Sequence, residues 1–220
     1  IITVKYSSSG NLVWSSRYNG LGNDDDLASA IAVDGLGNVI VTGYSVGLIS
    51  SEDFLTIKYN SAGTEMWIGS YDNPDMNDID IANAMILDNS GNIYIAGFSI
   101  GNGSAEDFAT VKYNAVGDEQ WVRRYNGGGN DYDITSGIAV DGSGNIIVTG
   151  YSAGNGSSED YATVKYNSSG VQQWASRYTG PGNVHDNART IKVDAAGNVY
   201  VAGEVGLSGT GYDYATVKYN

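Results

Sequence analysis

The chain has 220 residues, of which 41% are hydrophobic, so its composition is that of a folded protein and excludes a disordered one. Its 25 acidic and 11 basic residues give a formal net charge of −14, which excludes a nucleic-acid-binding surface and disfavours contact with anionic membranes. The chain has no cysteine, so disulfides and thiolate metal sites are excluded, and its apolar runs are too short for insertion into a membrane.

The first predicted strand is Ile2–Tyr6, and because the chain starts almost inside it, we expect a processed or excised chain. A second strand is predicted at Asn11–Tyr18. The next two are Ala28–Val33, which is rich in small residues, and Asn38–Ser45, which is apolar on both faces. Small side chains suit the crowded innermost strand of a radial array, and two apolar faces indicate a sheet with neighbours on both sides.

The following stretch repeats this pattern with four short strands, predicted at Ala82–Asp88, Asn92–Ser99, Asp107–Asn114 and Glu119–Tyr125. Two kinds of tight turn join them. In Asp88–Asn92, the Asp accepts hydrogen bonds from the turn amides and the Gly supplies a positive φ, and Tyr59–Gly63 serves the second hairpin in the same way. No window has a helical stripe, so the sequence predicts an all-β protein.

One unit of about 53 residues recurs along the chain. Its tryptophans fall at 14, 67, 121 and 174, and the aspartates that open the third strand type fall at 53, 107, 160 and 213. The repeat predicts a single domain over 1–220, with units 1–52, 53–106, 107–159 and 160–212, and with 213–220 starting a fifth. Four-stranded units with short hairpins and two buried faces indicate the blades of a β-propeller.

The segment Ala139–Gly150, with counterparts at 32–43, 86–97 and 192–203, resembles the SBBP family of bacterial and archaeal β-propeller repeats. The resemblance covers the whole chain. It implies a secreted or surface protein, often part of something larger, and it carries over no catalytic residues.

Closure of the ring is the open question. By analogy with related propellers, three blades are complete, at Ala28–Tyr71, Ala82–Tyr125 and Thr135–Tyr178, while the fourth lacks its outermost strand. Asn11–Tyr18 could supply that strand and close a four-bladed ring. One strand is then surplus, because Ile2–Tyr6 and the end of the chain are copies of the same third strand.

The surplus strand could fray, the chain could be an excerpt of a longer propeller, or the strand could pair with the next subunit. We favour the last outcome, a head-to-tail assembly through intermolecular strand pairing. The residues that would form the assembly strands are Ile2, Thr3, Val4, Lys5, Tyr6, Thr216, Val217, Lys218 and Tyr219.

Three segments match the Gly-x-Ser-x-Gly nucleophile motif of serine hydrolases, at 43–47, 97–101 and 150–154. That motif needs a helix after its turn, and here a Gly/Ser-rich loop and another strand follow. All three would also have to share the single His185, which we interpret as an ordinary surface residue. We therefore expect strand ends and no enzyme.

An acidic pair precedes three of the four innermost strands, formed by Asp24 with Asp26, Asp78 with Asp80, and Asp131 with Asp133. Oxygen ligands at alternate positions of a loop suit Ca²⁺. The other interpretation is that these side chains cap turns and accept amide hydrogen bonds. Calcium is therefore a candidate cofactor, with no other cofactor indicated.

From these patterns we expect a non-enzymatic, extracellular or cell-surface structural protein whose copies form a homo-oligomer or filament. The alternative is a glycan- or protein-binding propeller module excerpted from a larger surface protein. The 17 tyrosines favour that alternative weakly, because aromatic rings suit sugar stacking but here recur mostly in strands.

Overall fold

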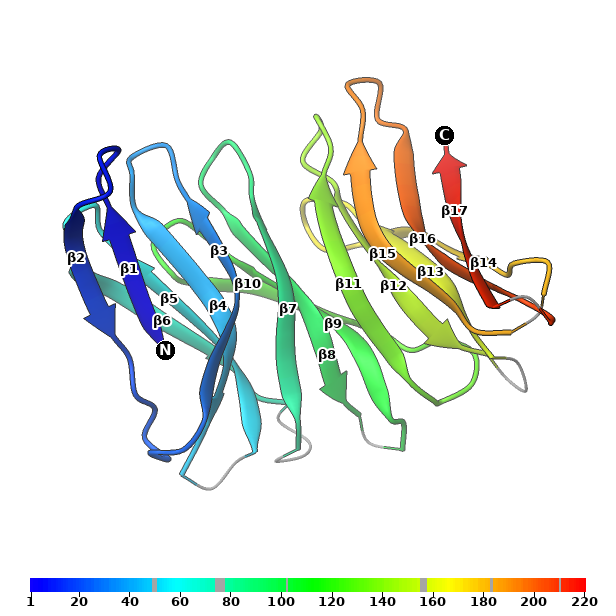
Figure 1. Cartoon of the computed structure of the whole chain (residues 1–220), viewed down its shortest axis with the longest axis horizontal. Helices are drawn as coiled ribbons and strands as arrows, with labels where there is room; N and C mark the ends of the chain where they lie inside the picture. Colours follow the sequence, from blue (N-terminus) through cyan, green and yellow to red (C-terminus); the bar gives the residue numbers. More distant parts are fainter. Residues whose placement is uncertain (49–50, 74–77, 102, 155–157, 183, 210) are drawn as a thin grey trace.

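The computed structural model describes residues 1–48, 51–73, 78–101, 103–154, 158–182, 184–209 and 211–220. These residues form seventeen β-strands and no helix, so nothing in the described part could cross a bilayer as a helix. Figure 1 shows the strands gathered into sheets that stand side by side from one end of the molecule to the other. The all-β, repeated-blade prediction is confirmed.

Three sheets are complete four-stranded antiparallel blades, each in the order of its strands along the chain. The first consists of β3 (Asp26–Val33), β4 (Val39–Val46), β5 (Glu52–Tyr59) and β6 (Glu65–Tyr71). The second consists of β7 (Asp80–Leu87), β8 (Ile93–Ile100), β9 (Glu106–Tyr113) and β10 (Glu119–Tyr125). The third consists of β11 (Asp133–Val140), β12 (Ile146–Ala153), β13 (Glu159–Tyr166) and β14 (Gln172–Tyr178).

A partial blade stands at each end of the array. The N-terminal end has β1 (Ile2–Tyr6) and β2 (Leu12–Arg17), which correspond to the two outer strands of a complete blade. The C-terminal end has β15 (Asp186–Val193), β16 (Val199–Leu207) and β17 (Gly211–Tyr219), which correspond to the three inner strands. The array is an open arc, with the two termini at opposite ends in Figure 1.

The four-bladed ring closed by Asn11–Tyr18 is therefore wrong for this structure. β2 pairs with β1 of its own chain, with Thr3 opposite Ser16 and Val4 opposite Ser15, and it does not lie beside β17. The tight turn between β1 and β2 makes this pairing local, so closing it costs far less chain entropy than joining the two ends of the chain. Ile2–Tyr6 is accordingly a paired strand in this structure, and it is not a free one.

The hairpin turns form as the sequence predicts. In the turn between β7 and β8, Asp88 Oδ1 accepts hydrogen bonds from the backbone N–H groups of Ser90 and Asn92, at 2.8 and 3.0 Å, and Gly91 has φ +80°. The Asn92 side chain donates to the other carboxylate oxygen of Asp88 at 2.7 Å. The inner strands begin earlier than expected, at Asp80 and not at Ala82, because Asp80 still pairs with Ser99 of β8.

The core lies between blades, as the two apolar faces of each strand predict. One cluster joins Ile40 and Phe54 of the first complete blade to Ile93 and Ile95 of the second, and equivalent clusters fill the other interfaces. Each innermost strand also has a β-bulge, and in β7 and β11 its extra residue, Asn83 or Ser136, reaches the next blade. Ser136 Oγ, for example, donates to the Ala188 carbonyl oxygen at 2.6 Å.

Candidate functional site

An aspartate opens every innermost strand, namely Asp26, Asp80, Asp133 and Asp186. Each accepts a hydrogen bond from a backbone N–H of the linker that arrives from the preceding blade, and the last three are fully buried. For Asp80 the donor is Asn73 at 2.7 Å, and for Asp133 it is Gly127 at 2.5 Å. These carboxylates therefore hold consecutive blades together.

The other predicted calcium ligands, Asp24, Asp78 and Asp131, behave differently. Each accepts a hydrogen bond from the N–H of the residue that follows it, at 2.9, 3.2 and 3.0 Å respectively. In the part of the chain that the structure describes, the group of three carboxylates close enough to share a metal ion contains only Asp80 of the six predicted residues. Calcium in the loops before the innermost strands stays a prediction.

The serines of the Gly-x-Ser-x-Gly segments contact these buried aspartates. Ser45 Oγ donates to Asp26 Oδ1 at 2.5 Å. In the next two blades the equivalent serines, Ser99 and Ser152, accept hydrogen bonds from Arg124 and Arg177. The hydroxyl groups have a structural role at the blade interface, which agrees with their interpretation as strand ends.

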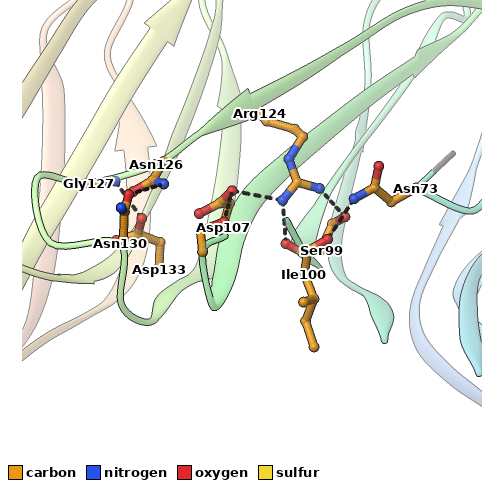
Figure 2. A network of polar contacts seen from close by, with 10 residues as sticks. Asn73, Ser99, Ile100, Asp107, Arg124, Asn126, Gly127, Asn130 and Asp133 are labelled. Carbon is orange, nitrogen blue, oxygen red and sulfur yellow. Dashed lines mark hydrogen bonds and ion pairs between the residues drawn. The ribbon is translucent and has the colours of Figure 1, made fainter. Parts of the chain in front are cut away.

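An arginine on the outer strand neutralises the aspartate at the start of the third strand in two blades. Arg124 Nη2 lies 2.8 Å from Asp107 Oδ2, and Arg177 Nη2 lies 2.8 Å from Asp160 Oδ2. Figure 2 shows the Arg124 guanidinium between Ser99 and Asp107, with Asp133 of the next blade nearby.

The first complete blade departs from this pattern at two positions. Ser70 stands where the next blade has Arg124, and Asp72 stands where it has Asn126. Asp53, Asp72 and Asp80 converge there, and one carboxylate oxygen of each lies within 4.8 Å of the others. Sequence reasoning missed Asp53 and Asp72 as site residues, although the loss of the arginine at position 70 was a readable signal.

Burial dominates the protonation behaviour of two of the buried aspartates. It raises the pKa of Asp80 to about 6, against the lowering effect of the Ser99 hydroxyl and the Asn73 N–H. It likewise raises the pKa of Asp133 to about 6, although Ser152 and the Gly127 N–H oppose it. The pKa of the more exposed Asp72 is also raised by burial. Negative charge is therefore costly at both interfaces.

A second group of polar side chains surrounds His185. Its Nδ1 atom contacts a carboxylate oxygen of Glu159, and both residues line a cavity of about 360 Å³. The other lining residues are Tyr151, Asn187, Arg189 and Tyr212. His185 is half exposed, as a surface residue should be, but it belongs to a polar pocket that the sequence did not reveal.

The residues of the predicted assembly strands lie at the two ends of the arc. Ile2, Thr3, Val4, Lys5 and Tyr6 form β1, which pairs with β2 on one edge. Thr216, Val217, Lys218 and Tyr219 lie in β17, which pairs with β16 on one edge. In the described sheets neither strand has a second neighbour, so each end leaves one ladder edge open.

An open arc of four-stranded antiparallel blades with buried faces defines the class of the protein, which is that of the β-propeller repeat proteins. Residues 120–156 match the SBBP family of β-propeller repeats. The resemblance drawn from the sequence is thereby confirmed. No curated protein matches the chain.

Solved structures share the fold at low sequence identity. The whole chain aligns with 68% of a protein of unknown function from Bacteroides caccae, with a TM-score of 0.54 and 11% identity. It also aligns over 87% of its length with 58% of a "putative gluconolactonase", with a TM-score of 0.41 and 12% identity. The first likeness supports the fold, and the second is too weak to support an argument.

Proposed function

We propose that this protein is a non-enzymatic structural protein of the cell exterior whose copies join head to tail through their incomplete end blades. The observation that carries the proposal is the exposure, at each end of the arc, of apolar side chains whose equivalents are buried or half-buried at the internal interfaces. The C-terminal end of one copy would face the N-terminal end of the next. Such an interface is heterologous and gives a ring or a filament, depending on whether the rotation closes.

The N-terminal end exposes the face of β3. Ile31 is 63% exposed, whereas Ile191, at the same position of β15, is 5% exposed because the blade β11–β14 covers it. Leu27 and Val33 of the same strand are also exposed, as are Ile2 and Val4 of β1. Ile2, Val4 and Ile31 line one surface hollow, because the two strands that would cover them are absent from the partial blade. Leu27 pairs with Tyr44 and therefore lies on the other face of β3.

The C-terminal end exposes the other half of the interface. Tyr214 of β17 is 87% exposed, whereas the equivalent Phe54, Phe108 and Tyr161 are 2%, 1% and 0% exposed. Burying one aromatic side chain of this kind contributes about 1.5–3 kcal/mol. The two ends are therefore complementary in the same way as two consecutive blades within the chain.

The open edge of β17 offers a way to strengthen this contact through backbone hydrogen bonds. β1 and β17 share the sequence Thr-Val-Lys-Tyr, at 3–6 and 216–219, so β17 of one copy has the residues to pair with β2 of the next in the register that β1 uses. That exchange would complete the four-stranded terminal blade and release β1. The ladder bonds formed in this way replace those that β1 makes with β2, so the net stabilisation comes from the apolar contact between the two ends.

Engineered cysteines test the exchange directly, because the chain has none of its own. In a variant with Ser16→Cys and Thr216→Cys, pairing of β17 with β2 of another copy predicts disulfide-linked oligomers on non-reducing gels. A variant with Ser16→Cys and Thr3→Cys is the matched control, since these positions face each other within one chain. A monodisperse monomer by light scattering, with no linked oligomers, would refute the assembly.

A second candidate function is glycan binding at the cavity around His185. The cavity combines two tyrosines with carboxylate, amide and guanidinium groups, a combination that suits stacking on a sugar ring and hydrogen bonding to its hydroxyls. Glycan-array binding by the wild type, lost in Tyr212→Ala and retained in Tyr132→Ala, would favour this function. Equal binding by both variants would remove the cavity from consideration.

A further inference from the structure

The blades alternate between two types along the chain. At one position of the second strand, β4 and β12 carry Ile40 and Ile147, whereas β8 and β16 carry Tyr94 and Tyr200. In every blade this residue lies opposite a lysine of the third strand. We call β3–β6 and β11–β14 the Ile-type blades, and β7–β10 and β15–β17 the Tyr-type blades.

The two types differ in the partner of the aspartate in the first hairpin turn. In the Ile-type blades the lysine reaches it, since Lys58 Nζ lies 3.0 Å from Asp34 Oδ2 and the equivalent distance in the other blade is 2.8 Å. In the Tyr-type blades Tyr94 donates its hydroxyl hydrogen to Asp88 at 3.0 Å, and Tyr200 makes the equivalent bond at 3.1 Å. The lysine then lies over the tyrosine ring, 5.1 and 5.5 Å from its centroid in the two blades.

The partial blade at the N-terminal end has the contacts of a Tyr-type blade. Trp14 of β2 donates through Nε1 to the turn between β5 and β6 at 3.1 Å, and Trp121 of β10 donates to the turn between β13 and β14 at 3.2 Å. Two positions further on, Ser16 and Arg123 donate to the same two turns, each at 2.6 Å. The buried Nε1 atom of Trp67, in the Ile-type strand β6, has no hydrogen bond among the described residues. We therefore assign β2 as the outer strand of a Tyr-type blade.

The two ends of the arc thus hold complementary parts of one blade type. The C-terminal end has the three inner strands of a Tyr-type blade, and the N-terminal end has its outer strand already packed on the Ile-type blade β3–β6. A Tyr-type blade followed by an Ile-type blade is also the order at the interface between β7–β10 and β11–β14. That interface is therefore the internal example of a junction between copies.

The receiving surface at the N-terminal end matches this internal example. Ile138 and Val140 of β11 pack against the cluster that contains Tyr94. The N-terminal end presents the same two residue types at the equivalent positions of β3, where Ile31 and Val33 are exposed. The surface that covers a Tyr-type blade within the chain is therefore repeated, uncovered, at the end of the arc.

We propose that Tyr200 is the specificity-determining residue of the junction between copies, so that the C-terminal end accepts an Ile-type blade, the first blade of a second copy, as its neighbour. The inference rests on the proposed head-to-tail assembly and adds the rule that selects its partner. Tyr200 is half-buried in the single chain, whereas Tyr94 is 1% exposed because the next blade covers it. With this junction the alternation of blade types continues from copy to copy without a break.

Sedimentation equilibrium of Tyr200→Ile tests the inference, because this substitution converts the end blade to the Ile type without making its surface more polar. We expect the dissociation constant between copies to rise about tenfold or more, since the smaller side chain leaves a void at the junction. Tyr200→Phe keeps the ring and loses only the hydroxyl that bonds Asp194 in the same blade, so it should associate as the wild type does. Tyr132→Ile, in the linker before β11, is the matched control and should leave association unchanged.

The same substitution at the internal interface gives a readout that does not depend on association. At low protein concentration Tyr94→Ile should lower the melting temperature, because the ring that it removes is buried between two blades. Tyr200→Ile should lower it less, because that ring has no blade over it in the single chain. An equal effect of the two substitutions would overturn the inference, because the interface would then not depend on the ring.

The outcomes separate this inference from the assembly on which it rests. If Tyr200→Ile associates as tightly as the wild type while Tyr214→Ser dissociates the copies, the specificity of Tyr200 is overturned and the assembly stands. Weakening by Tyr132→Ile as large as that by Tyr200→Ile would also overturn the specificity. A wild type that stays monomeric at every concentration would overturn the assembly and this inference with it.

Discussion

Two buried aspartates, Asp34 and Asp133, titrate in opposite directions because their hydrogen-bond partners differ. Burial raises the pKa of Asp34, but the Asn38 side chain, Lys58 and two backbone N–H groups together outweigh it and lower the pKa to about 2. Lys58 Nζ lies 3.0 Å from Asp34 Oδ2, and both side chains are buried. Among the described residues no lysine pairs with Asp133 in this way, and burial prevails there.

Lys58→Met should destabilise the protein by about 3 kcal/mol, because it leaves the Asp34 charge buried without its ion pair. The measurement is the free energy of unfolding in urea at pH 7. Lys5→Met is the control. Lys5 donates to the Ser61 carbonyl as Lys58 does to that of Ala115, but no carboxylate of the described residues is paired with it, so its loss should cost under about 1 kcal/mol.

The low pKa of Asp34 adds a pH dependence with a definite sign. The stability that its ionised form contributes is fully present above the unfolded-state pKa near 3.8 and is lost as the pH falls toward 2. Lys58→Met should therefore lose less stability than the wild type between pH 4 and pH 2. An equal loss in both proteins would show that the ion pair does not determine this pKa.

Asp133→Asn should show the opposite dependence. Since the folded-state pKa of Asp133 is raised to about 6, its protonated form favours folding, and the benefit is lost as the pH rises through 6. The stability of the wild type relative to Asp133→Asn should therefore increase by about 2 kcal/mol as the pH falls from 7 to 4. A difference that stays constant with pH would show that Asp133 titrates normally.

At the scale of single elements, one glycine recurs in the second strand of every blade for a steric reason. Gly43, Gly97, Gly150 and Gly203 each pack against the β-bulge of the neighbouring innermost strand, where an added Cβ would overlap a backbone carbonyl oxygen. The bulge in turn directs a side chain such as Ser136 to the next blade. The Gly-x-Ser-x-Gly segments therefore couple strand pairing to blade packing.

Gly150→Ala should destabilise the protein by more than about 3 kcal/mol, because its Cβ would collide with the Ile134 carbonyl and neither backbone can move without breaking the ladder. Gly142→Ala is the control, since a Cβ there would meet nothing within 4 Å. It should change the free energy of unfolding by less than about 0.5 kcal/mol. Equal effects in thermal or urea unfolding would contradict the steric explanation.

At the scale of the whole molecule, the two ends of the arc differ, because one carries two outer strands of a blade and the other carries three inner strands. Every internal interface buries aromatic and aliphatic side chains from both blades, and the two ends present the halves of one more such interface. A molecule with exposed surfaces of this kind lowers its free energy by covering them with further blades. Association should therefore depend on apolar residues at the ends and little on the polar loops.

If copies associate as proposed, Tyr214→Ser should shift them to monomers in sedimentation or light-scattering measurements, because it removes the most exposed aromatic side chain of β17. Its melting temperature at low protein concentration should change little, since the residue is exposed in the single chain. Tyr132→Ser removes a comparable exposed ring from a linker and should not alter association. Equal weakening by both substitutions would indicate nonspecific contact.

The sequence by itself determined the repeat, the strands, the hairpin turns and the stacking of blades. These features are local, because side-chain alternation and turn residues such as Asp88 and Gly91 specify them within a few positions of the chain. Strand ends were predicted to within about two residues, and the error came from Asp80, a polar residue that continues the ladder.

Only the tertiary structure decided how the ends pair and which charges meet. The copies of Thr-Val-Lys-Tyr in β1 and β17 are alike in sequence, so chain entropy, and not residue identity, selects β1 as the partner of β2. Asp53, Asp72 and Asp80 are separated along the chain, and strand register together with the path of the linker between blades brings their carboxylates within 4.8 Å. Contacts of this kind depend on the packing of one blade on the next, which no local pattern specifies.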